Sequence, residues 1–260
     1  MKILITSGGT IEPIDSVRSI ANTSTGMLGS LIARAFGENA ATEKIYYVAG
    51  KKAVLPTLSE PDKLVVLPVL TVADLDEAVR KILAENTVDI IIHSMAVSDY
   101  RVKAVATAES LAPELTDGQK RRTEDGATPE EGLYNTLISH HNSIIPQDGK
   151  LPSNIDNLIL FMERTPKIIT LFQSLAPKAI LVGFKLLDGV PFETLIENAL
   201  HIMKENKCAF VLANDLKGIT DTGHIGYLVD ESKRIIRLET KNQIAQAILE
   251  AVLEKKGGKP

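Results

Sequence analysis

A polar loop near the start of the chain carries the side chains best suited to chemistry. Arg18 and Asn22 lie on it together with several hydroxyl groups, and Ser24, Gly26 and Gly29 lead into a helical pattern. Glycines at a helix start let backbone N–H groups approach a phosphate closely, and the helix dipole adds partial positive charge there. A plain structural turn does not need so many functional groups, so we predict an anion-binding site.

The elements that must position this loop are a buried strand over 2–6 and a helix over 26–37. Gly8 follows the strand almost directly and adds to the glycine-rich character of the loop. The loop is not a standard nucleotide motif, because it lacks the Lys-Ser/Thr end of a P-loop and does not read G-x-G-x-x-G. The pattern alone indicates a nucleotide or phosphate-ester site.

Apolar runs rich in Ile, Val and Leu alternate with helical patterns along the chain. Strands are expected over 2–6, 44–49, 63–67, 88–93, 158–163, 179–184 and 209–213, with a hairpin over 225–229 and 234–238. Helices are expected over 26–37, 72–85, 166–175, 191–206 and 241–255, with start signals at Thr71, Pro166, Pro191 and Thr240. Nearly continuous apolar strands suit a parallel sheet that is covered on both faces. The alternation therefore predicts an α/β fold, with a three-layer, doubly wound, Rossmann-like and mostly parallel sheet.

The composition is that of an ordinary globular protein. The chain has 260 residues, of which 44% are hydrophobic and 24% charged, and a formal net charge of −4. That charge disfavours nucleic-acid binding through bulk electrostatics, and no apolar run approaches the length that spans a bilayer. The single cysteine, Cys208, excludes an internal disulfide and is expected to be a buried, inert thiol. No signal peptide is visible, so we expect a cytoplasmic location.

One segment, 103–157, interrupts the alternation with a composition rich in Glu, Asp, Gly, Pro, Ser and Thr. A loop of that length is usually a lid, a dimerisation arm or a disordered insertion. Its basic run over 119–122 is expected on a solvated face, and the adjacent His140 and His141 lack the partners of a metal site. We therefore predict a single domain over 1–260 with a flap and dimerisation arm, and no protein-held metal.

Ligands of an open parallel sheet bind beyond the carboxyl ends of its strands. Polar or glycine-bearing segments stand there after four expected strands: the loop with Asn22, then 93–101, 183–185 and 213–215. Their combination indicates a nucleotide-sized pocket. Simpler roles stay open, namely turn residues for Asn22, Asp99, Asn214 and Asp215, and a core position for Phe184.

Taken together, these motifs resemble phosphopantothenoylcysteine synthetase, the phosphopantothenate–cysteine ligase of coenzyme A synthesis, in its stand-alone form. The resembling motifs, in chain order, are 5–10 with 12–15, 17–18 with 22–26, 96–100, 149–151, 165–167, 182–185 and 213–215.

The resemblance implies a two-step reaction. The carboxylate of 4′-phosphopantothenate attacks the α-phosphate of a nucleoside triphosphate, which gives an acyl-nucleotidyl anhydride and pyrophosphate. The amine of L-cysteine then attacks the activated carbonyl and releases the nucleoside monophosphate. The resemblance also implies Mg²⁺ with the triphosphate, CTP in preference to ATP, and a homodimer with its contact arm around 100–160.

The resemblance also implies roles for residues of this chain. Arg18, Asn22 and Lys150 would be catalytic, with Arg18, Asn22 and Ala96 at the acyl intermediate and Lys150 on a mobile flap over the nucleotide. Nucleotide contacts would come from Gly8, Ser24, Gly26, Gly29, His93, Ser94, Met95, Asp99, Lys150, Pro166, Phe184, Lys204 and Lys207. Fixed donors and cations suit the charge that develops on a phosphoryl group.

Two other functions stay open at this point. A nucleotide-sensing protein without turnover could use the same sheet. A dinucleotide-dependent oxidoreductase is disfavoured, because G-x-G-x-x-G is missing and no acidic residue ends the expected strand over 44–49.

Overall fold

The computed structural model describes residues 1–124, 128–139, 149–220 and 223–257, without the side chains of 118–124 and 139. The chain divides into two compact units, and we describe each by itself. The first unit holds 1–11, 21–98 and 166–260, and the second holds 12–20 and 99–165.

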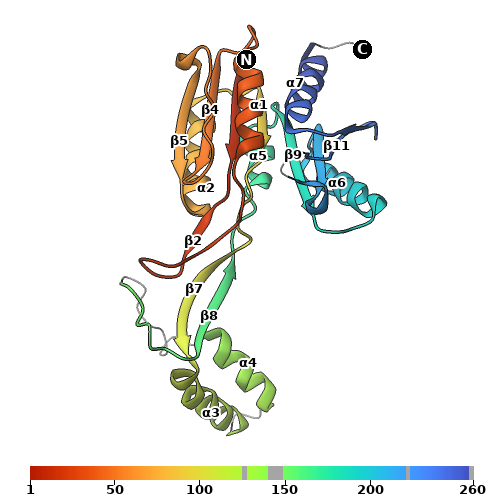
Figure 1. The fold of residues 1–260 in the computed structure, drawn as a ribbon. Helices are drawn as coiled ribbons and strands as arrows, with labels where there is room; N and C mark the ends of the chain where they lie inside the picture. Colours follow the sequence, from red (N-terminus) through yellow and green to blue (C-terminus); the bar gives the residue numbers. More distant parts are fainter. Residues whose placement is uncertain (125–127, 140–148, 221–222, 258–260) are drawn as a thin grey trace. The chain divides into compact units, whose positions relative to one another are not determined.

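The first unit is built on one eight-stranded sheet (Figure 1) in the order β12-β11-β10-β9-β6-β1-β4-β5. Its strands are β1 (Lys2–Ser7), β4 (Lys44–Gly50), β5 (Leu64–Val69), β6 (Ile90–His93), β9 (Ile180–Leu187), β10 (Phe210–Asp215), β11 (Gly226–Asp230) and β12 (Ile235–Leu238). Neighbours from β10 through β5 pair in parallel, and β11 and β12 add an antiparallel hairpin at one edge. The predicted mostly parallel α/β fold is confirmed.

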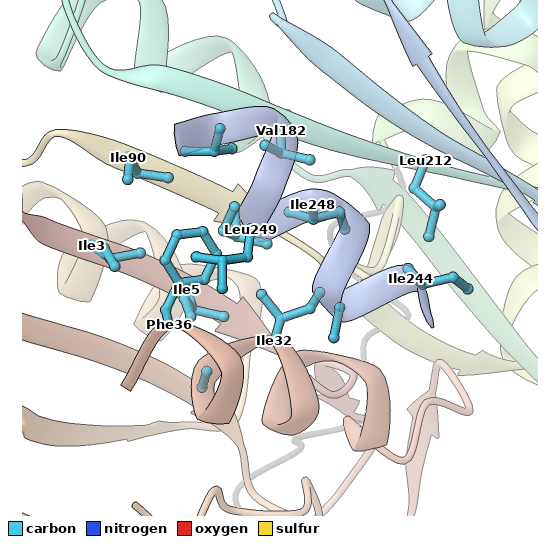
Figure 2. Close-up of a cluster of buried hydrophobic side chains, with 14 of the residues drawn as sticks. Ile3, Ile5, Ile32, Phe36, Ile90, Val182, Leu212, Ile244, Ile248 and Leu249 are labelled. Atoms are coloured by element: carbon cyan, nitrogen blue, oxygen red, sulfur yellow. The ribbon is translucent and has the colours of Figure 1, made fainter. Parts of the chain in front are cut away.

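Helices cover both faces of this sheet. They are α1 (Met27–Gly37), α2 (Val72–Glu85), α5 (Ile169–Leu175), α6 (Phe192–Asn206) and α7 (Lys241–Gly257), with short 3-10 turns at Pro61–Lys63 and Leu216–Gly218. Successive strand side chains point to opposite faces. Ile3 and Ile5 of β1 therefore pack against α1 and α7 (Figure 2), while Leu4 joins the cluster under α2, α5 and α6.

Helix starts show how local sequence fixes these elements. The predicted capping box of α2 is confirmed: Asp74 N–H donates to Thr71 Oγ1 at 3.1 Å, and Thr71 N–H donates to Asp74 Oδ2 at 2.9 Å. Thr240 caps α7 in the same way with Gln243. The prediction for 166–175 is wrong at its start, because α5 begins only at Ile169.

The second unit contains an antiparallel pair of strands and two helices. β7 (Tyr100–Thr107) pairs with β8 (Leu158–Arg164), and α3 (Ala108–Glu124) and α4 (Pro129–Ser139) lie between them in the sequence. The strand expected over 158–163 thus forms, but in this separate sheet rather than in the parallel one. Most residues of a further two-stranded sheet, formed by β2 (Ile11–Pro13) and β3 (Ser19–Ala21), also belong to this unit, while Ile11 and Ala21 belong to the first.

The segment 103–157 is more ordered in its described parts than its composition indicated, because α3 and α4 occupy much of it. Its role as a flap and dimerisation arm, and the single-domain description of the chain, stay predictions. His140 and His141 lie outside the described residues, as do the side chains of 119–122.

Candidate functional site

The candidate site begins where two neighbouring parallel strands end. β1 and β6 pair with Thr6 opposite His93. From β1 the sheet continues through β4 and β5 on one side, and from β6 through β9 and β10 on the other. Strand order reverses at this point, and doubly wound sheets bind their ligands there.

The loops that follow β1 and β6 run side by side. Ala96 N–H donates to the Gly8 carbonyl at 2.8 Å, and Thr10 N–H donates to the Ala96 carbonyl at 3.2 Å. Buried side chains join the same loops, since Thr10 Oγ1 donates to Ser98 Oγ at 2.9 Å and accepts from Ser98 N–H at 2.8 Å. The structure therefore brings the predicted residues Gly8 and Ala96 together, and Thr10 and Ser98 are contacts that sequence reasoning missed.

Two glycines of the first loop are required by both conformation and space. Gly8 and Gly26 have φ angles of 86° and 70°. A Cβ at Gly8 would lie 2.6 Å from the Ala53 Cβ, and a Cβ at Gly26 would lie 2.9 Å from the same atom. Glycine alone adopts such angles without steric cost. Both glycines thus approach Ala53, in the turn after β4, closely, and no sequence pattern pointed to this residue.

The start of α1 packs directly on the ends of β1 and β6. A Cβ at Gly29 would lie 2.2 Å from Ser7 Oγ and 2.9 Å from Ser94 Oγ. Gly26 is the N-cap of the helix, and the half-buried Ser24 precedes it. The positive end of the helix dipole and its first N–H groups therefore lie at the switch point, which suits a phosphate.

Asn22 lies at the same end of the sheet. Its N–H donates to the Thr10 carbonyl at 3.3 Å, and a Cβ at Gly9 would lie 2.3 Å from its carbonyl oxygen. Gly9 in turn forms a parallel bridge with Ala96. Asn22 and Ala96 are thus both next to Gly9, and the residue Asn22 is exposed.

His93 and Ser94 hold the end of β6 in place. His93 Nδ1 lies 2.8 Å from Thr6 Oγ1, and its ring packs edge-on against Phe172 with centroids 5.2 Å apart. Burial lowers the pKa of His93 to about 4, so the imidazole is neutral at neutral pH. Ser94 Oγ donates to the Thr6 carbonyl at 2.7 Å. The two residues therefore shape the backbone that a ligand would meet after β6.

Three other residues that were predicted to contact the nucleotide differ in how far they are buried. Met95 is buried in the core cluster under α2, α5 and α6. Phe184 lies on β9 two residues beyond the Val182 pair with Ile92, so it lies one residue past the level at which β6 ends, and it packs against the opposite core cluster. Pro166 is exposed in the segment ahead of α5.

Lys204 and Lys207 lie towards the amino ends of the strands, at the end of the sheet opposite the candidate site. Both stand at the end of α6, where Lys207 is the C-cap with a φ of 50°. Because α6 runs back from the carboxyl end of β9 to the amino end of β10, its own end lies away from the loops after β1 and β6. The structure does not bring these two lysines together with the other predicted residues of the first unit.

Arg18, Asp99 and Lys150 belong to the second unit. Asp99 and Lys150 are exposed, and the Asp99 carbonyl accepts from Thr165 N–H at 3.0 Å. Arg18 Nη2 donates to the carbonyl of Leu151 at 2.7 Å. Arg18 therefore contacts the residue that follows Lys150, so the structure brings these two expected catalytic residues near each other within one unit.

Asp15 is a residue of this region that sequence reasoning missed. Its carboxylate is fully buried and accepts N–H groups from Val17, Arg18 and Leu151 at 2.9, 2.6 and 3.0 Å. Burial raises the pKa of Asp15, but the three N–H groups and the Arg18 charge outweigh it and hold the pKa below its ordinary value. An aspartate that bonds the backbone two residues ahead is a recognisable turn signal, whereas its contact with Leu151 has no sequence signal.

Three further features bear on metal binding, membrane insertion and thiol reactivity. Among the described residues, no group of three or more His, Cys, Asp or Glu side chains is placed to hold a metal ion. Over that same part of the chain, the helices are too short or too polar to cross a membrane. Cys208 is buried as predicted, and burial raises the pKa of its thiol to about 12.

Comparison with known proteins gives a family match across most of the chain. A family model described as the DNA/pantothenate metabolism flavoprotein C-terminal domain matches residues 1–111 and 138–255. The coenzyme A biosynthesis bifunctional protein CoaBC of Thermococcus kodakarensis is 28% identical over 255 residues, which is 96% of this chain and 50% of that protein. The protein of the same name from Methanocaldococcus jannaschii is 26% identical, with 96% and 50% covered. The chain thus spans about half the length of these curated relatives.

Solved structures show the same fold. The DNA/pantothenate metabolism flavoprotein from Streptococcus pneumoniae has a TM-score of 0.76 and 31% identity, and the match covers 98% of this chain and 99% of that one. A Cab2 variant in complex with phosphopantothenate-cysteine has a TM-score of 0.65 and 19% identity, with 98% and 86% covered.

Proposed function

The chain belongs to the family of the DNA/pantothenate metabolism flavoprotein C-terminal domain, and on that premise we propose that it is a phosphopantothenate–cysteine ligase. It joins 4′-phosphopantothenate to L-cysteine in coenzyme A biosynthesis, in the cytoplasm, and consumes CTP. The names of its curated relatives support the pathway. The phosphopantothenate-cysteine in the Cab2 complex supports the substrate class.

The observation that carries the proposal is the convergence at the switch point of the sheet. Gly26 and Gly29 place the start of α1 against the ends of β1 and β6, and Asn22 lies beside Ala96 through Gly9. A phosphate-binding helix start and an exposed amide therefore share one end of the sheet. A triphosphate and a carboxylate that reacts with it need such a pair of neighbouring sites.

The proposed reaction needs no covalent enzyme intermediate. A carboxylate oxygen of 4′-phosphopantothenate attacks the α-phosphorus of CTP, and the bond to the β-phosphate oxygen breaks to release pyrophosphate. The cysteine nitrogen then attacks the acyl carbon, the bond from that carbon to the nucleotidyl oxygen breaks, and CMP leaves as the amine loses a proton. Charge develops on phosphoryl and carbonyl oxygens in both steps, so the protein contributes mainly donors and cations.

We assign the residues to these steps as follows. Gly8, Ser24, Gly26 and Gly29 hold the triphosphate, and Asn22 donates to the carbonyl region of the acyl intermediate. Ala96 and Arg18 also contact that intermediate, and Lys150 neutralises phosphate charge. The remaining nucleotide contacts come from His93, Ser94, Met95, Asp99, Pro166 and Phe184.

Magnesium enters this proposal with the substrate. Since the described residues form no cluster of three or more metal-binding side chains, we propose that Mg²⁺ is carried by the triphosphate, as Mg²⁺ commonly is. No step above is assigned to the ion.

The test is pyrophosphate release by the purified chain with 4′-phosphopantothenate, L-cysteine, Mg²⁺ and either CTP or ATP. We expect release that depends on phosphopantothenate and is faster with CTP. Nucleotide binding without release would favour a sensor, and faster release with ATP would overturn the nucleotide assignment.

We also propose that the protein acts as a homodimer through its second unit. Tyr134 and Ile138 of α4 are 64% and 51% exposed, which is unusual for large apolar side chains. Light scattering should give twice the mass of one chain, and Tyr134→Ser with Ile138→Ser should lower it. A wild-type mass equal to one chain would contradict this.

A further inference from the structure

A buried carboxylate in the second unit joins two loops that hold predicted catalytic residues. Asp15 Oδ1 accepts from the N–H groups of Val17 and Arg18, and Oδ2 accepts from the N–H of Leu151. Arg18 adds to the same contact, because its Nε lies 3.4 Å from Asp15 Oδ2 and its Nη2 donates to the Leu151 carbonyl at 2.7 Å. Leu151 is therefore held at its N–H by Asp15 and at its carbonyl by Arg18.

Lys150 lies between two residues that are fixed through their backbone. Ser16 N–H donates to the Gly149 carbonyl at 3.4 Å, and Leu151 is 1% exposed. Lys150 itself is exposed. The chain on both sides of Lys150 is thus attached to the loop of Arg18, while its ammonium group stays in solvent.

We propose that Asp15 is a positioning residue that holds the Lys150 segment against the Arg18 loop. It acts through Arg18 and Lys150 rather than on the substrate. The consequence for catalysis rests on the function proposed above, whereas the holding contact does not. Charge is essential to it, because three N–H donors face two carboxylate oxygens that carry no hydrogen.

Asp15→Asn is the sharpest variant for this contact. The asparagine keeps the shape but has one acceptor oxygen, so its NH₂ group must face at least one of the three N–H groups. A buried donor without an acceptor destabilises the local structure. Arg18→Gln serves as a second variant, since it removes the bond to the Leu151 carbonyl and leaves Asp15 in place.

Trypsin cleavage after Lys150 measures the contact directly, without any assay of activity. Cleavage needs local opening, so its rate follows the population of the open segment. We expect Asp15→Asn to speed this cleavage about tenfold or more, with Arg18→Gln acting in the same direction. Mass spectrometry identifies the product, and Lys150→Gln should abolish it.

The matched control is Asp230→Asn. Asp230 also caps a turn by accepting backbone N–H groups, from Ser232 and Arg234, but in the β11–β12 hairpin of the first unit. We expect it to leave cleavage after Lys150 unchanged. Wild-type cleavage rates in both Asp15→Asn and Arg18→Gln, with circular dichroism showing folded protein, would overturn the proposal.

Kinetics separate positioning from general support of the fold. We expect Asp15→Asn to lower kcat/KM for CTP in the same direction as Lys150→Gln. The fold-loss of kcat/KM in the double variant should be smaller than the product of the two single fold-losses, because both substitutions act through the Lys150 side chain. Losses that multiply would overturn the positioning role. If the wild type releases no pyrophosphate, the proposed function fails. The ratio of the trypsin cleavage rates after Lys150 in Asp15→Asn and in the wild type still tests whether Asp15 holds the Lys150 segment.

Discussion

The amide of Asn22 is the side chain at the switch point whose removal should affect chemistry without affecting the fold. The residue is exposed, and its backbone N–H donates to the Thr10 carbonyl while its carbonyl oxygen lies against Gly9. We expect Asn22→Ala to melt at the same temperature as the wild type. Its rate of product formation should fall about 100-fold or more, because a hydrogen-bond donor to a charged oxygen is lost. Thr23→Ala, at the exposed neighbour in the same loop, is the control and should keep near-normal turnover. Near-normal turnover of Asn22→Ala would remove its catalytic role.

His93 should make the stability of the protein depend on pH in a defined window. Its pKa is about 4 in the folded protein and 6.5 as an ordinary value. The unfolded chain therefore binds a proton first, and stability is lost as pH falls below 6.5 and on towards 4. Urea unfolding of the wild type should show a steeper loss over that window than His93→Gln.

The control for this pH effect is His201→Gln, because the His201 side chain is 67% exposed. It should follow the wild-type curve. Equal pH dependence in wild type and His93→Gln would mean that burial does not keep the imidazole neutral.

At the scale of elements, α2 should depend on its capping box. Thr71 accepts from Asp74 N–H, and Asp74 accepts from the N–H groups of Leu70 and Thr71. Thr71→Ala should lower the free energy of unfolding by about 1 kcal/mol, as measured by urea. Thr57→Ala, at an exposed loop position, should cost much less. A cost of Thr71→Ala equal to that of Thr57→Ala would contradict the role of the cap.

The same capping signals explain how far sequence alone predicted the elements. Local chemistry fixes helix starts, so α2 and α7 were found with their caps, and continuous apolar runs located the strands of the parallel sheet. Periodicity does not say which partner a strand takes, so the run over 158–163 was not assigned to its antiparallel pair with β7. α3 was missed because its sequence carries few large apolar residues. α4, which does carry them, was missed because the composition of the whole segment 103–157 indicated a loop.

The candidate site was predictable to the extent that it depends on strand ends. Gly8, Asn22, Gly26 and Ala96 follow β1 and β6, whose adjacency comes from the doubly wound order. The structure does not bring Lys204 to these strand ends, because its place in the fold depends on the direction of α6 rather than on sequence distance. Contacts between distant segments, such as Asp15 with Leu151, leave no local pattern.

At the scale of the whole molecule, the two units should differ in local stability. The first has two extensive core clusters. Among the described residues of the second, the buried apolar side chains are Ala104, Val105, Ala106, Leu111 and Leu151. A segment with few buried apolar contacts opens at lower free energy.

Hydrogen exchange followed by mass spectrometry checks this difference. Amides of β7 and β8 should exchange as one group and well before those of β1 and β6. The amides of β9, which lie in the parallel sheet, are the internal reference. Exchange of β7 as slow as that of β9 would mean that the second unit opens only with the first.

The central place of β1 in its sheet has a consequence for biosynthesis. β1 leaves the ribosome before its neighbours β4 and β6, and α7, which covers α1, is made after all of them. Until then the apolar side chains of α1, including Ile32 and Phe36, have no cover from α7. Native pairing at such sequence distance is slow to form. A nascent chain that already carries every residue of the first loop therefore still exposes apolar surface of α1, and ligand binding at the loop would mark a chain that has completed its fold.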